Sequence, residues 1–508
     1  MPLSYQRSLT RHRLPASRIE RERALGGDNP LIGLACFHCR HRYWPKAIVI
    51  PLGERPDALR SIRNGAGVYG QHAAAQSQAV SDIERRTIRK VTRRLVPFLM
   101  LCYFIAYLDR VNVSFAGPSM IKDLSFTQTV FGAGAGIFFV GYFLFEVPSN
   151  LALDKFGARK WIARIMFTWG VISAGTAFIW NDTSFYVIRV LLGVAEAGFF
   201  PGIIFYLACW FPSHYRARII GWFMFAIPIS TVIGAPISGL ILGLDGFLGL
   251  KGWQWLFILE AIPAPIMALV VWNYLTDRPV DAHWLSRDER QWLTDRLDAE
   301  RSRESSVRLS VWQSLFDRRV LALGLAYVGI VTPNYGIVFF LPQIIQAFGG
   351  LSDIEVGLIN AIPYVAGAIS MVLWSRHSDA VQERKWHAAA PAVMMALGFG
   401  AAAFVNDPYL KIVTIALAAF GFAIAPVFWT LPTTFLSGTA AAAGIAAINS
   451  IGNLGGYFGP QVFGIIKDAT QSDAGGLLFL AASALMASVV ILALGHNRAL
   501  ESDAMRHA

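Results

Sequence analysis

LVPFLMLCYFIAYLDRVNVSF occupies residues 95–115 and holds the adjacent charges Asp109 and Arg110 inside an apolar run. A second run, FYVIRVLLGVAEAGFF at residues 185–200, holds Arg189 and Glu196. A charge at the centre of a membrane helix costs roughly 2.5–3.5 kcal/mol on insertion scales. We therefore expect these four side chains to face a protein-lined, hydrated cavity in which they pair, and the two arginines predict a site for an anion.

The composition indicates an integral membrane protein. Of the 508 residues, 55% are hydrophobic and 15% are charged, and the mean hydropathy is +0.47. Many of the 45 Gly and 24 Pro fall inside apolar runs, which in lipid is typical of close helix approach and bent helices. We expect an all-α protein with twelve transmembrane helices, because runs of about 20 apolar residues cross a bilayer core. The predicted spans are residues 95–115, 130–153, 161–180, 185–211, 219–242, 253–275, 320–348, 356–374, 387–404, 412–435, 444–466 and 476–494.

The basic residues predict the orientation of these spans. Lys and Arg are concentrated before the first span and in alternate short loops, and the intervening loops are nearly free of them. The positive-inside rule then places both termini in the cytoplasm. Much of the net charge of +11 is accounted for in this way, so we do not expect nucleic-acid binding.

A charged stretch at residues 276–318 divides the spans into two sets of six. We expect a first half at residues 81–275, a cytoplasmic loop at 276–318, a second half at 319–496 and a cytoplasmic tail at 497–508. DKFGARKWIA after the second span has a weak counterpart, SRHSDAVQERKWHA, after the eighth. Two related six-helix halves are typical of transporters.

Residues 1–80 are Arg-rich and contain no apolar run long enough for a span. We expect this segment either to be disordered or to precede the true start of translation near SDIERRTIRKVTRR. The stretch CFHCRH at residues 36–41 offers Cys and His side chains but not four spaced ligands in a folding unit, so we expect no metal site.

Several motifs together resemble a known family. They are YLDRVNVS, FEVPSNLALDKFGARKW, RVLLGVAEAGFFPG, WFPSHYRAR and LWSRHSDAVQERKWH. The chain resembles the anion:cation symporter branch of the major facilitator superfamily, and within it the tartrate, phthalate and hydroxyphenylacetate type of permease. The resemblance covers roughly residues 84–500 and implies import of a small organic carboxylate together with protons. Asn150 stands where the loop motif usually has Gly, and Lys155 where Arg is common.

Asp109 and Glu196 are the candidate proton-coupling residues. Glu196 lies two helical turns after Arg189, so both share a face, and Gly193 between them leaves room for a ligand or another helix. The functional interpretation is that Glu196 takes up a proton while Arg189 is neutralised alternately by Glu196 and by substrate. The resemblance places the coupling carboxylate and an arginine here. The alternatives are a fixed ion pair, and for Asp109 a structural partnership with one of the arginines.

Arg110 is the candidate ligand of the substrate carboxylate. It shares a helical stripe with Tyr107 and Tyr103, whereas Asp109 aligns with Asn112 toward a neighbouring helix. The remaining candidate substrate contacts are polar or aromatic residues in other spans, namely Arg189, Tyr142, Trp429, Asn449 and Asn453. In the second half, Tyr335 is among further neutral polar groups, and any single one of them can instead be a contact between helices.

Three other sets of residues have expected roles outside substrate binding. The resemblance implies that Asp154, Arg159 and Lys160 belong to a gating loop whose carboxylate latches onto a neighbouring helix terminus in the outward-open state. Glu146 is expected to have a structural or gating role, and Glu260 to form an interhelical pair.

We expect a monomeric proton-coupled importer of an organic anion in the inner or plasma membrane, with the lipid bilayer, protons and substrate as its partners and without a cofactor. An enzyme is not expected, because no nucleophile with a base and no ligand cluster stands out. The alternatives left open are an organic anion exchanger, a sugar-acid symporter and, with less support, a drug exporter or membrane sensor. Arginines at membrane depth argue against cationic drugs.

Overall fold

The computed structural model describes residues 56–304, 317–381, 383–432 and 438–494. Most of the predicted N-terminal extension, the CFHCRH stretch and the predicted tail lie outside these residues. By its internal contacts the chain separates into two units, residues 1–73 and 74–508. The described part of the first unit is the beginning of one helix, α1 (Pro56–Asp123). The following description concerns the second unit.

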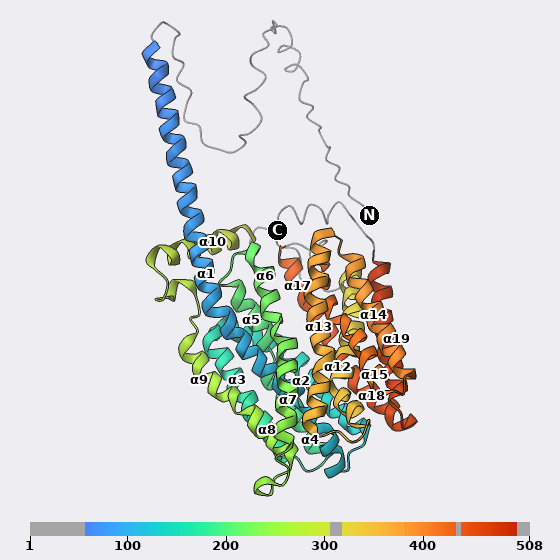
Figure 1. The fold of residues 1–508 in the computed structure, drawn as a ribbon. Coiled ribbons are helices and arrows are strands. Elements are labelled where there is room, and N and C mark those ends of the chain that lie inside the picture. The colour runs from blue at the N-terminus through green and yellow to red at the C-terminus, as the bar shows by residue number, and fades with distance from the viewer. Residues whose placement is uncertain (1–55, 305–316, 382, 433–437, 495–508) are drawn as a thin grey trace, which may run out of the picture. The chain divides into compact units, whose positions relative to one another are not determined.

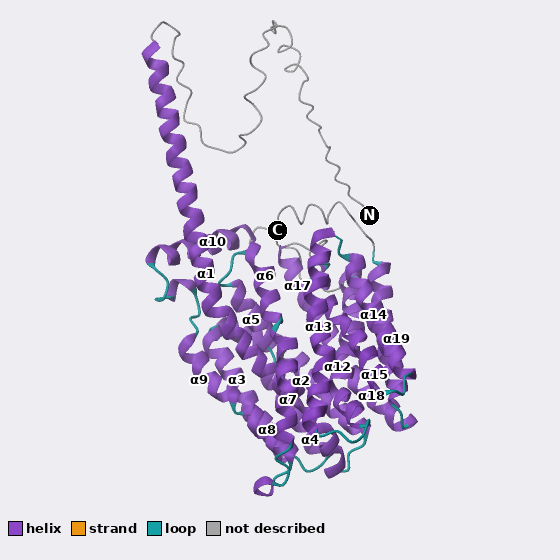
Figure 2. Ribbon diagram, in the orientation of Figure 1, coloured by secondary structure: helices purple, strands orange, loops and turns teal. Residues whose placement is uncertain are grey.

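Every secondary-structure element in the described part of the chain is a helix (Figure 2). The first half of the bundle continues from α1 with α2 (Gln128–Phe156), α3 (Ala158–Gly175), α4 (Asp182–Glu196), α5 (Phe199–Ala208), α6 (Ser213–Met224), α7 (Ala226–Leu242), α8 (Gly252–Ala261) and α9 (Pro263–Tyr274). The connecting stretch contains α10 (Arg287–Glu304). The second half contains α12 (Arg318–Gln346), α13 (Asp353–Val381), α14 (Lys385–Phe404), α15 (Pro408–Ala418), α16 (Ile424–Phe428), α17 (Gly438–Asn453), α18 (Gly455–Thr470) and α19 (Asp473–Ala493). Short 3₁₀ turns occur at Thr176–Phe178, Phe247–Gly249, Pro279–Asp281 and Ala419–Ala423. Figure 1 shows the two halves as neighbouring groups of helices.

The predicted spans coincide with helices or with pairs of abutting helices, except that residues 433–435 of the tenth lie outside the described part. By length and composition, 10 helical segments of the described chain are long and apolar enough to cross a membrane. The spans predicted at residues 161–180 and 444–466 are not among them. α3 contains three basic residues, Arg159, Lys160 and Arg164, and α17 and α18 are each only 16 residues long because a break separates them.

Local sequence explains several of the helix ends. Thr127 caps α2 by accepting a hydrogen bond from the Val130 backbone N–H. Asn181 and Ser184 form a reciprocal capping box at the start of α4. The same span is interrupted after Glu196, where Gly198 has a φ of 83° that glycine adopts without a steric penalty. This break ends α4 directly beside the charged residue.

The two halves are joined tightly at one end of the bundle, which is opposite the end that carries α10 (Figure 1). There α2 packs on α18 and α7 packs on α13. A Cβ on Gly464 would overlap the Gln128 carbonyl, and one on Gly357 would overlap the Ala235 carbonyl, so these helix backbones touch. Asp468 at the end of α18 also accepts hydrogen bonds from the Gln128 and Thr129 backbone N–H groups, at 3.0 and 2.7 Å. The carboxylate therefore binds the positive end of the α2 dipole across the two halves.

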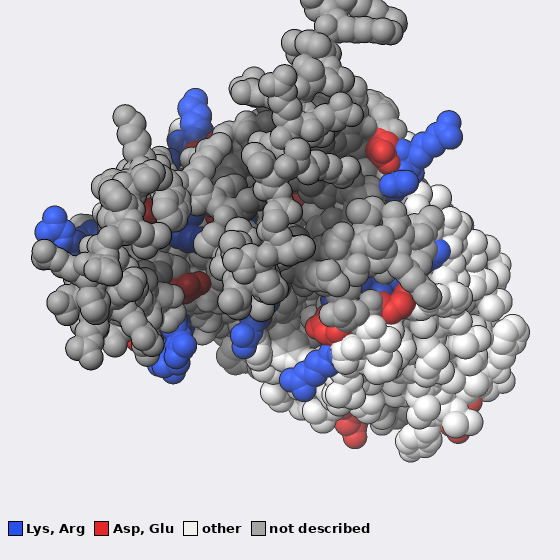
Figure 3. Space-filling view, turned by 90° about the horizontal axis from the view of Figure 1, so that it is seen from above, with Lys and Arg blue, Asp and Glu red and all other residues white. Residues whose placement is uncertain are grey.

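Apolar side chains are exposed along the helices of the bundle, and charged side chains lie at its end. Large apolar side chains along the helices are exposed, including Leu151 on α2 at 68% and Phe404 on α14 at 76%. Figure 3 looks onto the end that carries α10, where Lys, Arg, Asp and Glu side chains are visible, whereas the flank at the lower right is mostly uncharged. Apolar flanks of this kind suit contact with lipid tails.

α10 packs at the charged end of the bundle and forms ion pairs with α1. Glu289 forms ion pairs with Lys90 at 3.0 Å and Arg86 at 3.3 Å, both on α1. Although its burial would raise the pKa of Glu289, hydrogen bonds from the Ser286 backbone N–H and from Lys90 lower the pKa overall. A carboxyl whose folded-state pKa is depressed stabilises the fold above its unfolded-state pKa. This contribution is lost as the pH falls through the folded-state value.

Replacement of Gly193 should destabilise the packing of α4 against α2. A Cβ at this position would overlap the Phe138 carbonyl and lie 3.0 Å from the Tyr142 backbone nitrogen. We expect Gly193→Ala to lower the free energy of unfolding by about 1–3 kcal/mol, because backbone on both sides must shift. Thermal unfolding in detergent measures the change. The control is Gly400→Ala in α14, where a Cβ has no neighbour within 4 Å and no loss is expected. Equal melting temperatures for the two variants would contradict the assigned helix contact.

Candidate functional site

A buried ion pair joins α1 to α4. Arg110 Nη2 donates to Glu196 Oε1, and only 7% and 3% of these side chains are exposed. Arg110 Nη1 donates to the hydroxyl of Tyr335 on α12 at 3.2 Å. The planar guanidinium thus contacts the first half and the second half of the bundle at once. Because α4 ends at Glu196, this carboxylate lies at a helix break, where the backbone leaves the regular helix.

One aromatic ring lies within cation–π distance of both arginines. The guanidinium carbons of Arg110 and Arg189 are 5.4 and 5.2 Å from the centroid of the fully buried Phe138 ring. Tyr142, one turn along α2, has its ring centroid 5.6 Å from the Arg110 guanidinium. These distances suit cation–π attraction and give both cations an apolar wall.

Arg189 is fully buried and braces α4 against α2. Its Nε donates to the Gly134 carbonyl at 3.1 Å and its Nη2 to the Ala135 carbonyl at 3.2 Å. Its Nη1 is buried without a hydrogen-bond partner among the described residues. In this structure Glu196 pairs with Arg110, so the expected pairing of Arg189 with Glu196 is not the one formed. A ligand role for Arg189 stays a prediction, with Nη1 as the available donor.

Asp109 points toward α3, away from Arg110. Its Oδ1 accepts hydrogen bonds from Ser173 Oγ and, at 3.1 Å, from Asn112 Nδ2. Asp109 and Asn112 thus share a side of α1, as their spacing predicts. Asp109 is nevertheless close enough to Arg189 and Glu196 for their charges to interact. The two candidate proton-coupling carboxylates therefore belong to one buried electrostatic cluster.

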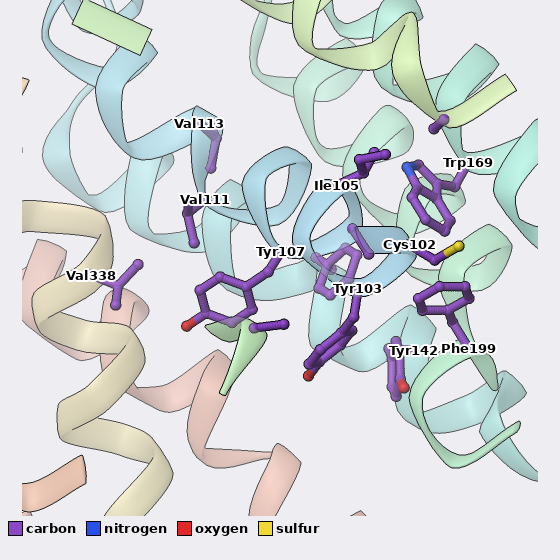
Figure 4. Close-up of a cluster of buried hydrophobic side chains, with 14 of the residues drawn as sticks. Cys102, Tyr103, Ile105, Tyr107, Val111, Val113, Tyr142, Trp169, Phe199 and Val338 are labelled. Atoms are coloured by element: carbon purple, nitrogen blue, oxygen red, sulfur yellow. The ribbon is translucent and has the colours of Figure 1, made fainter. Parts of the chain in front are cut away.

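The three predicted tyrosines lie in different environments. Tyr103 stacks on Phe223 at 4.7 Å between ring centroids, within an aromatic group. Tyr107 lies toward the second half, near Tyr335. Figure 4 shows Tyr103 and Tyr107 projecting from α1, with Tyr142 and Phe199 beside Tyr103 and Val338 of α12 on the side of Tyr107. Of the three, Tyr142 is the one whose ring lies over the Arg110 guanidinium.

The second half contributes Asn449, Asn453 and Trp429. Asn449 Nδ2 donates to Glu146 Oε1 of α2 at 3.0 Å, which is a contact between the halves. Trp429 packs against the Tyr327 ring at 4.9 Å. Asn453 is half-buried at the end of α17. Asn449 was expected to contact substrate and Glu146 to have a structural or gating role, but in the structure the two side chains bind each other.

The predicted gating loop lies between α2 and α3. Asp154 and Lys160 are exposed. The backbone N–H of Arg159 donates to Asp277 Oδ1 at 2.8 Å, and its guanidinium forms a 3.8 Å ion pair with the same carboxylate. The basic part of the loop is thus held by the segment that follows α9. Gly157, with a φ of 89°, allows the sharp change of direction into α3.

Sequence reasoning missed Phe138, Ser173 and Asp277. Phe138 is one of many aromatic residues in an apolar run, so its closeness to two guanidinium groups has no signal in the sequence. Ser173 is a polar residue within a predicted span, which is a weak signal of an interhelical hydrogen bond. Asp277 follows directly after the sixth predicted span and could have been considered as a partner for the basic loop motif.

Comparisons with known proteins agree with this architecture. The family model described as Major Facilitator Superfamily matches residues 99–460. An Agrobacterium vitis protein named "Putative tartrate transporter" is 53% identical over 418 residues, covering 82% of this chain and 96% of its own length. The "Quinolone resistance transporter" of Acinetobacter baumannii is 44% identical and covers 78% of this chain and 92% of its own. These matches confirm the resemblance seen in the motifs, and the relatives are named as transporters rather than as enzymes.

A solved structure shares the fold. The inward open conformation of the xylose transporter from E. coli superimposes with a TM-score of 0.65 at 15% identity, covering 82% of this chain and 99% of that chain. This likeness, together with the helical architecture, confirms the predicted fold of two six-helix halves.

Arg189→Lys should destabilise the ligand-free protein. A lysine ammonium cannot reproduce the planar fork that reaches two carbonyls on α2, and each lost hydrogen bond from a charged group costs about 1.5–3 kcal/mol. Thermal unfolding without substrate measures the effect. The matched control is Arg164→Lys on α3, where the guanidinium lies 4.0 Å from the Trp161 ring centroid and lysine retains a cation. An unchanged melting temperature for Arg189→Lys would argue that the Arg189 guanidinium is not a structural brace.

Proposed function

The chain belongs to the Major Facilitator Superfamily and is a multi-pass membrane transporter, and on that premise we propose that it imports a small organic carboxylate together with protons. The observation that carries the proposal is the buried Arg110–Glu196 pair. Arginine is suited to bidentate binding of a carboxylate, and here its charge is held by a group that a proton can neutralise. The word tartrate in the names of two Agrobacterium vitis relatives supports a hydroxylated dicarboxylate as the substrate class.

Competition for Arg110 couples the substrate to the proton. Without substrate, the guanidinium is neutralised by Glu196. An incoming carboxylate that binds Arg110 leaves Glu196 as an uncompensated buried charge, which is costly in a membrane-embedded site. Protonation of Glu196 removes that cost. Substrate binding and protonation therefore favour one another, as coupled transport requires.

Asp109 is the second proposed proton carrier. It lies in the same electrostatic cluster as Glu196 but binds Ser173 and Asn112 rather than an arginine. Protonation of Asp109 reduces the negative charge near Arg189, whose Nη1 is then free to contact the substrate. We further propose that the hydroxyl groups of the substrate contact polar and aromatic side chains from both halves. These are Tyr103, Tyr107, Tyr142, Trp429, Asn449 and Asn453.

Alternating access is proposed from the asymmetric contacts between the halves. The end formed by α2, α18, α7 and α13 is closed by backbone contacts and by Asp468. With both termini in the cytoplasm, as the basic loops predict, this closed end faces outward, so we propose that the structure represents a state that is closed to the outside. Rocking of the halves would break the Asp468 contact and open the site to the outside. Protons would then load, and the higher internal pH would release proton and substrate after the return.

The loop between α2 and α3 is the proposed gate at the cytoplasmic end. Asp154 is exposed here, whereas Arg159 is held by Asp277. In the outward-open state, Asp154 would latch onto a neighbouring helix terminus, since a carboxylate is stabilised at the positive end of a helix dipole. We propose that the protein works as a monomer in a bacterial inner membrane.

Export of a drug is the second candidate function, because one relative is named for quinolone resistance. Transport into right-side-out vesicles separates the two functions. Import predicts accumulation of labelled tartrate when the outside is more acidic. An exporter would show no such accumulation and would instead reduce the internal concentration of a drug, and an exchanger would require an internal counter-anion.

Arg110→Lys should weaken substrate binding even though the positive charge is retained. Lysine lacks the fork that binds a carboxylate through two N–H groups, and hydrogen bonds to charged groups contribute about 1.5–3 kcal/mol. We expect at least about a tenfold weaker response in a thermal-shift titration with tartrate. Arg218→Lys, at an exposed position on α6, is the control. Unchanged affinity in the Arg110 variant would remove Arg110 as the carboxylate ligand.

Glu196→Gln should separate substrate movement from proton coupling. The amide mimics a permanently protonated carboxyl, so exchange of labelled for unlabelled substrate should continue. Accumulation driven by a pH gradient should be lost. Both are measured in proteoliposomes, with Glu355→Gln, at an exposed carboxylate of α13, as the control. Normal gradient-driven accumulation in Glu196→Gln would transfer the proton site to Asp109 or elsewhere.

A further inference from the structure

Glu260 is a buried carboxylate that the transport scheme above does not use. It lies on α8 with 3% of its surface exposed. Ser238 Oγ on α7 is hydrogen-bonded to Glu260 Oε1 at 2.6 Å. Among the residues that the structure describes, Glu260 forms no ion pair with Lys, Arg or His, so it lacks the cation that a buried carboxylate normally needs.

Asn112 connects Glu260 with Asp109. Its Nδ2 donates to Asp109 Oδ1 at 3.1 Å, and its amide also lies within hydrogen-bonding reach of Glu260. Two oxygens in this group, Asn112 Oδ1 and Glu260 Oε2, are buried without a hydrogen-bond partner among the described residues. Both are acceptors when Glu260 is ionised. A proton on the Glu260 carboxyl supplies the missing donor, and buried polar atoms of this kind are rarely left unpaired.

The charges of the buried cluster also require a proton. The cluster contains two guanidinium groups, Arg110 and Arg189, and three carboxylates, Asp109, Glu196 and Glu260, which interact electrostatically as a chain from Arg110 to Glu260. If all five were ionised, one negative charge would be uncompensated at membrane depth. Glu196 has Arg110 as its partner, and Asp109 has two hydrogen-bond donors and a nearby Arg189. Glu260 is therefore the carboxyl best placed to be neutral.

We propose that Glu260 holds a proton in the ligand-free state and exchanges it with Asp109 through Asn112, as a third proton-carrying residue of the transporter. This proposal rests on the proposed proton-coupled function. The Glu260 carboxyl gives its proton to Asn112 Oδ1, and a proton on Asn112 Nδ2 passes to Asp109 Oδ1. Asn112 is then in its imidic-acid form and returns to the amide when the proton moves back, so the number of charges in the pair is unchanged by the transfer. The groups that face Glu260 are Asp109 and Asn112 from α1 and Ser238 from α7, and α3 contributes Ser173, which binds Asp109.

The position of Asp109 explains why the proton on Glu260 can move during transport. Asp109 lies between Glu260 and the Arg189 and Glu196 charges, and it interacts with all three. When a substrate anion enters and Glu196 is protonated, the field at Asp109 changes. The preferred position of the shared proton then changes too, because the two carboxyls titrate as a coupled pair. A permanently neutral structural acid would not respond in this way.

The first test detects the proton on Glu260 without measuring transport. Infrared spectra of the purified full chain without tartrate should contain a carbonyl-stretch band of a buried protonated carboxyl, and the difference between spectra with and without tartrate should show that this band changes. The band should be absent in Glu260→Gln and present in Glu289→Gln, which makes the same change at a carboxylate outside the membrane. Retention of every protonated-carboxyl band in Glu260→Gln would overturn the assignment of the proton to Glu260.

The second test measures coupling in proteoliposomes. Glu260→Gln should retain tartrate binding and counterflow. At one unit of pH gradient, its steady-state accumulation should be about tenfold lower than that of the wild type, because one proton fewer moves with each substrate. An accumulation ratio equal to that of the wild type would contradict proton carriage by Glu260, even where the infrared band is lost.

Asn112→Leu provides an independent test if Glu260→Gln fails to fold. Leucine has a similar volume but cannot bridge the two carboxyls, so the Glu260 band should remain in the absence of substrate and should no longer respond to tartrate. A normal response would exclude exchange through Asn112. If wild-type protein shows no pH-driven accumulation, the proposed function itself fails, and the infrared band still tests whether Glu260 is protonated.

Discussion

The buried ion pair between Arg110 and Glu196 is the interaction on which the rest of the structure depends. A guanidinium at membrane depth is tolerated only with a partner, and a carboxylate there needs a cation for the same reason. The pair holds α1 close to α4. Arg110 also donates to Tyr335 on α12, so the pair is connected to the second half. A ligand that displaces Glu196 and Tyr335 from Arg110 would leave a buried carboxylate without its cation and would remove a contact between the halves. This link between local charge and helix arrangement is what makes the site suited to coupled transport.

Close helix packing determines where each charge can point. Gly193 lets α4 approach α2 so closely that Arg189 reaches backbone carbonyls, and the Phe138 ring is within cation–π distance of both Arg189 and Arg110. Two arginines that appear equivalent in the sequence consequently have different contacts. Arg189 donates mainly to backbone carbonyls of α2 and so holds α4 against α2. Arg110 instead pairs with Glu196, a group that can be protonated. Small residues also close one end of the bundle, where a few contacts between the halves can break together.

The fold was largely predictable from the sequence, whereas the pairing within the site was not. Apolar runs indicate most of the spans, because a helix needs enough length and hydropathy to cross a bilayer. Asp109, Arg110, Arg189 and Glu196 could be selected as candidates for the same reason, since charge is costly there. Their partners depend on how far each helix is rotated about its axis and on the break after Glu196, and neither follows from spacing alone. The interhelical role of Glu260 was expected, but an ion-pair partner for it is not found among the described residues.

Proton uptake on substrate binding tests the central claim most directly. Purified protein in weakly buffered detergent solution is mixed with tartrate at neutral pH, and the change in free proton concentration is recorded. If the substrate displaces Glu196 from Arg110 and leaves its carboxylate buried, binding should take up protons, about one for each carboxylate group that displaces a protein carboxylate. The uptake should decline at a pH low enough to protonate Glu196 before binding. Tartrate binding without proton uptake at any pH would contradict the account.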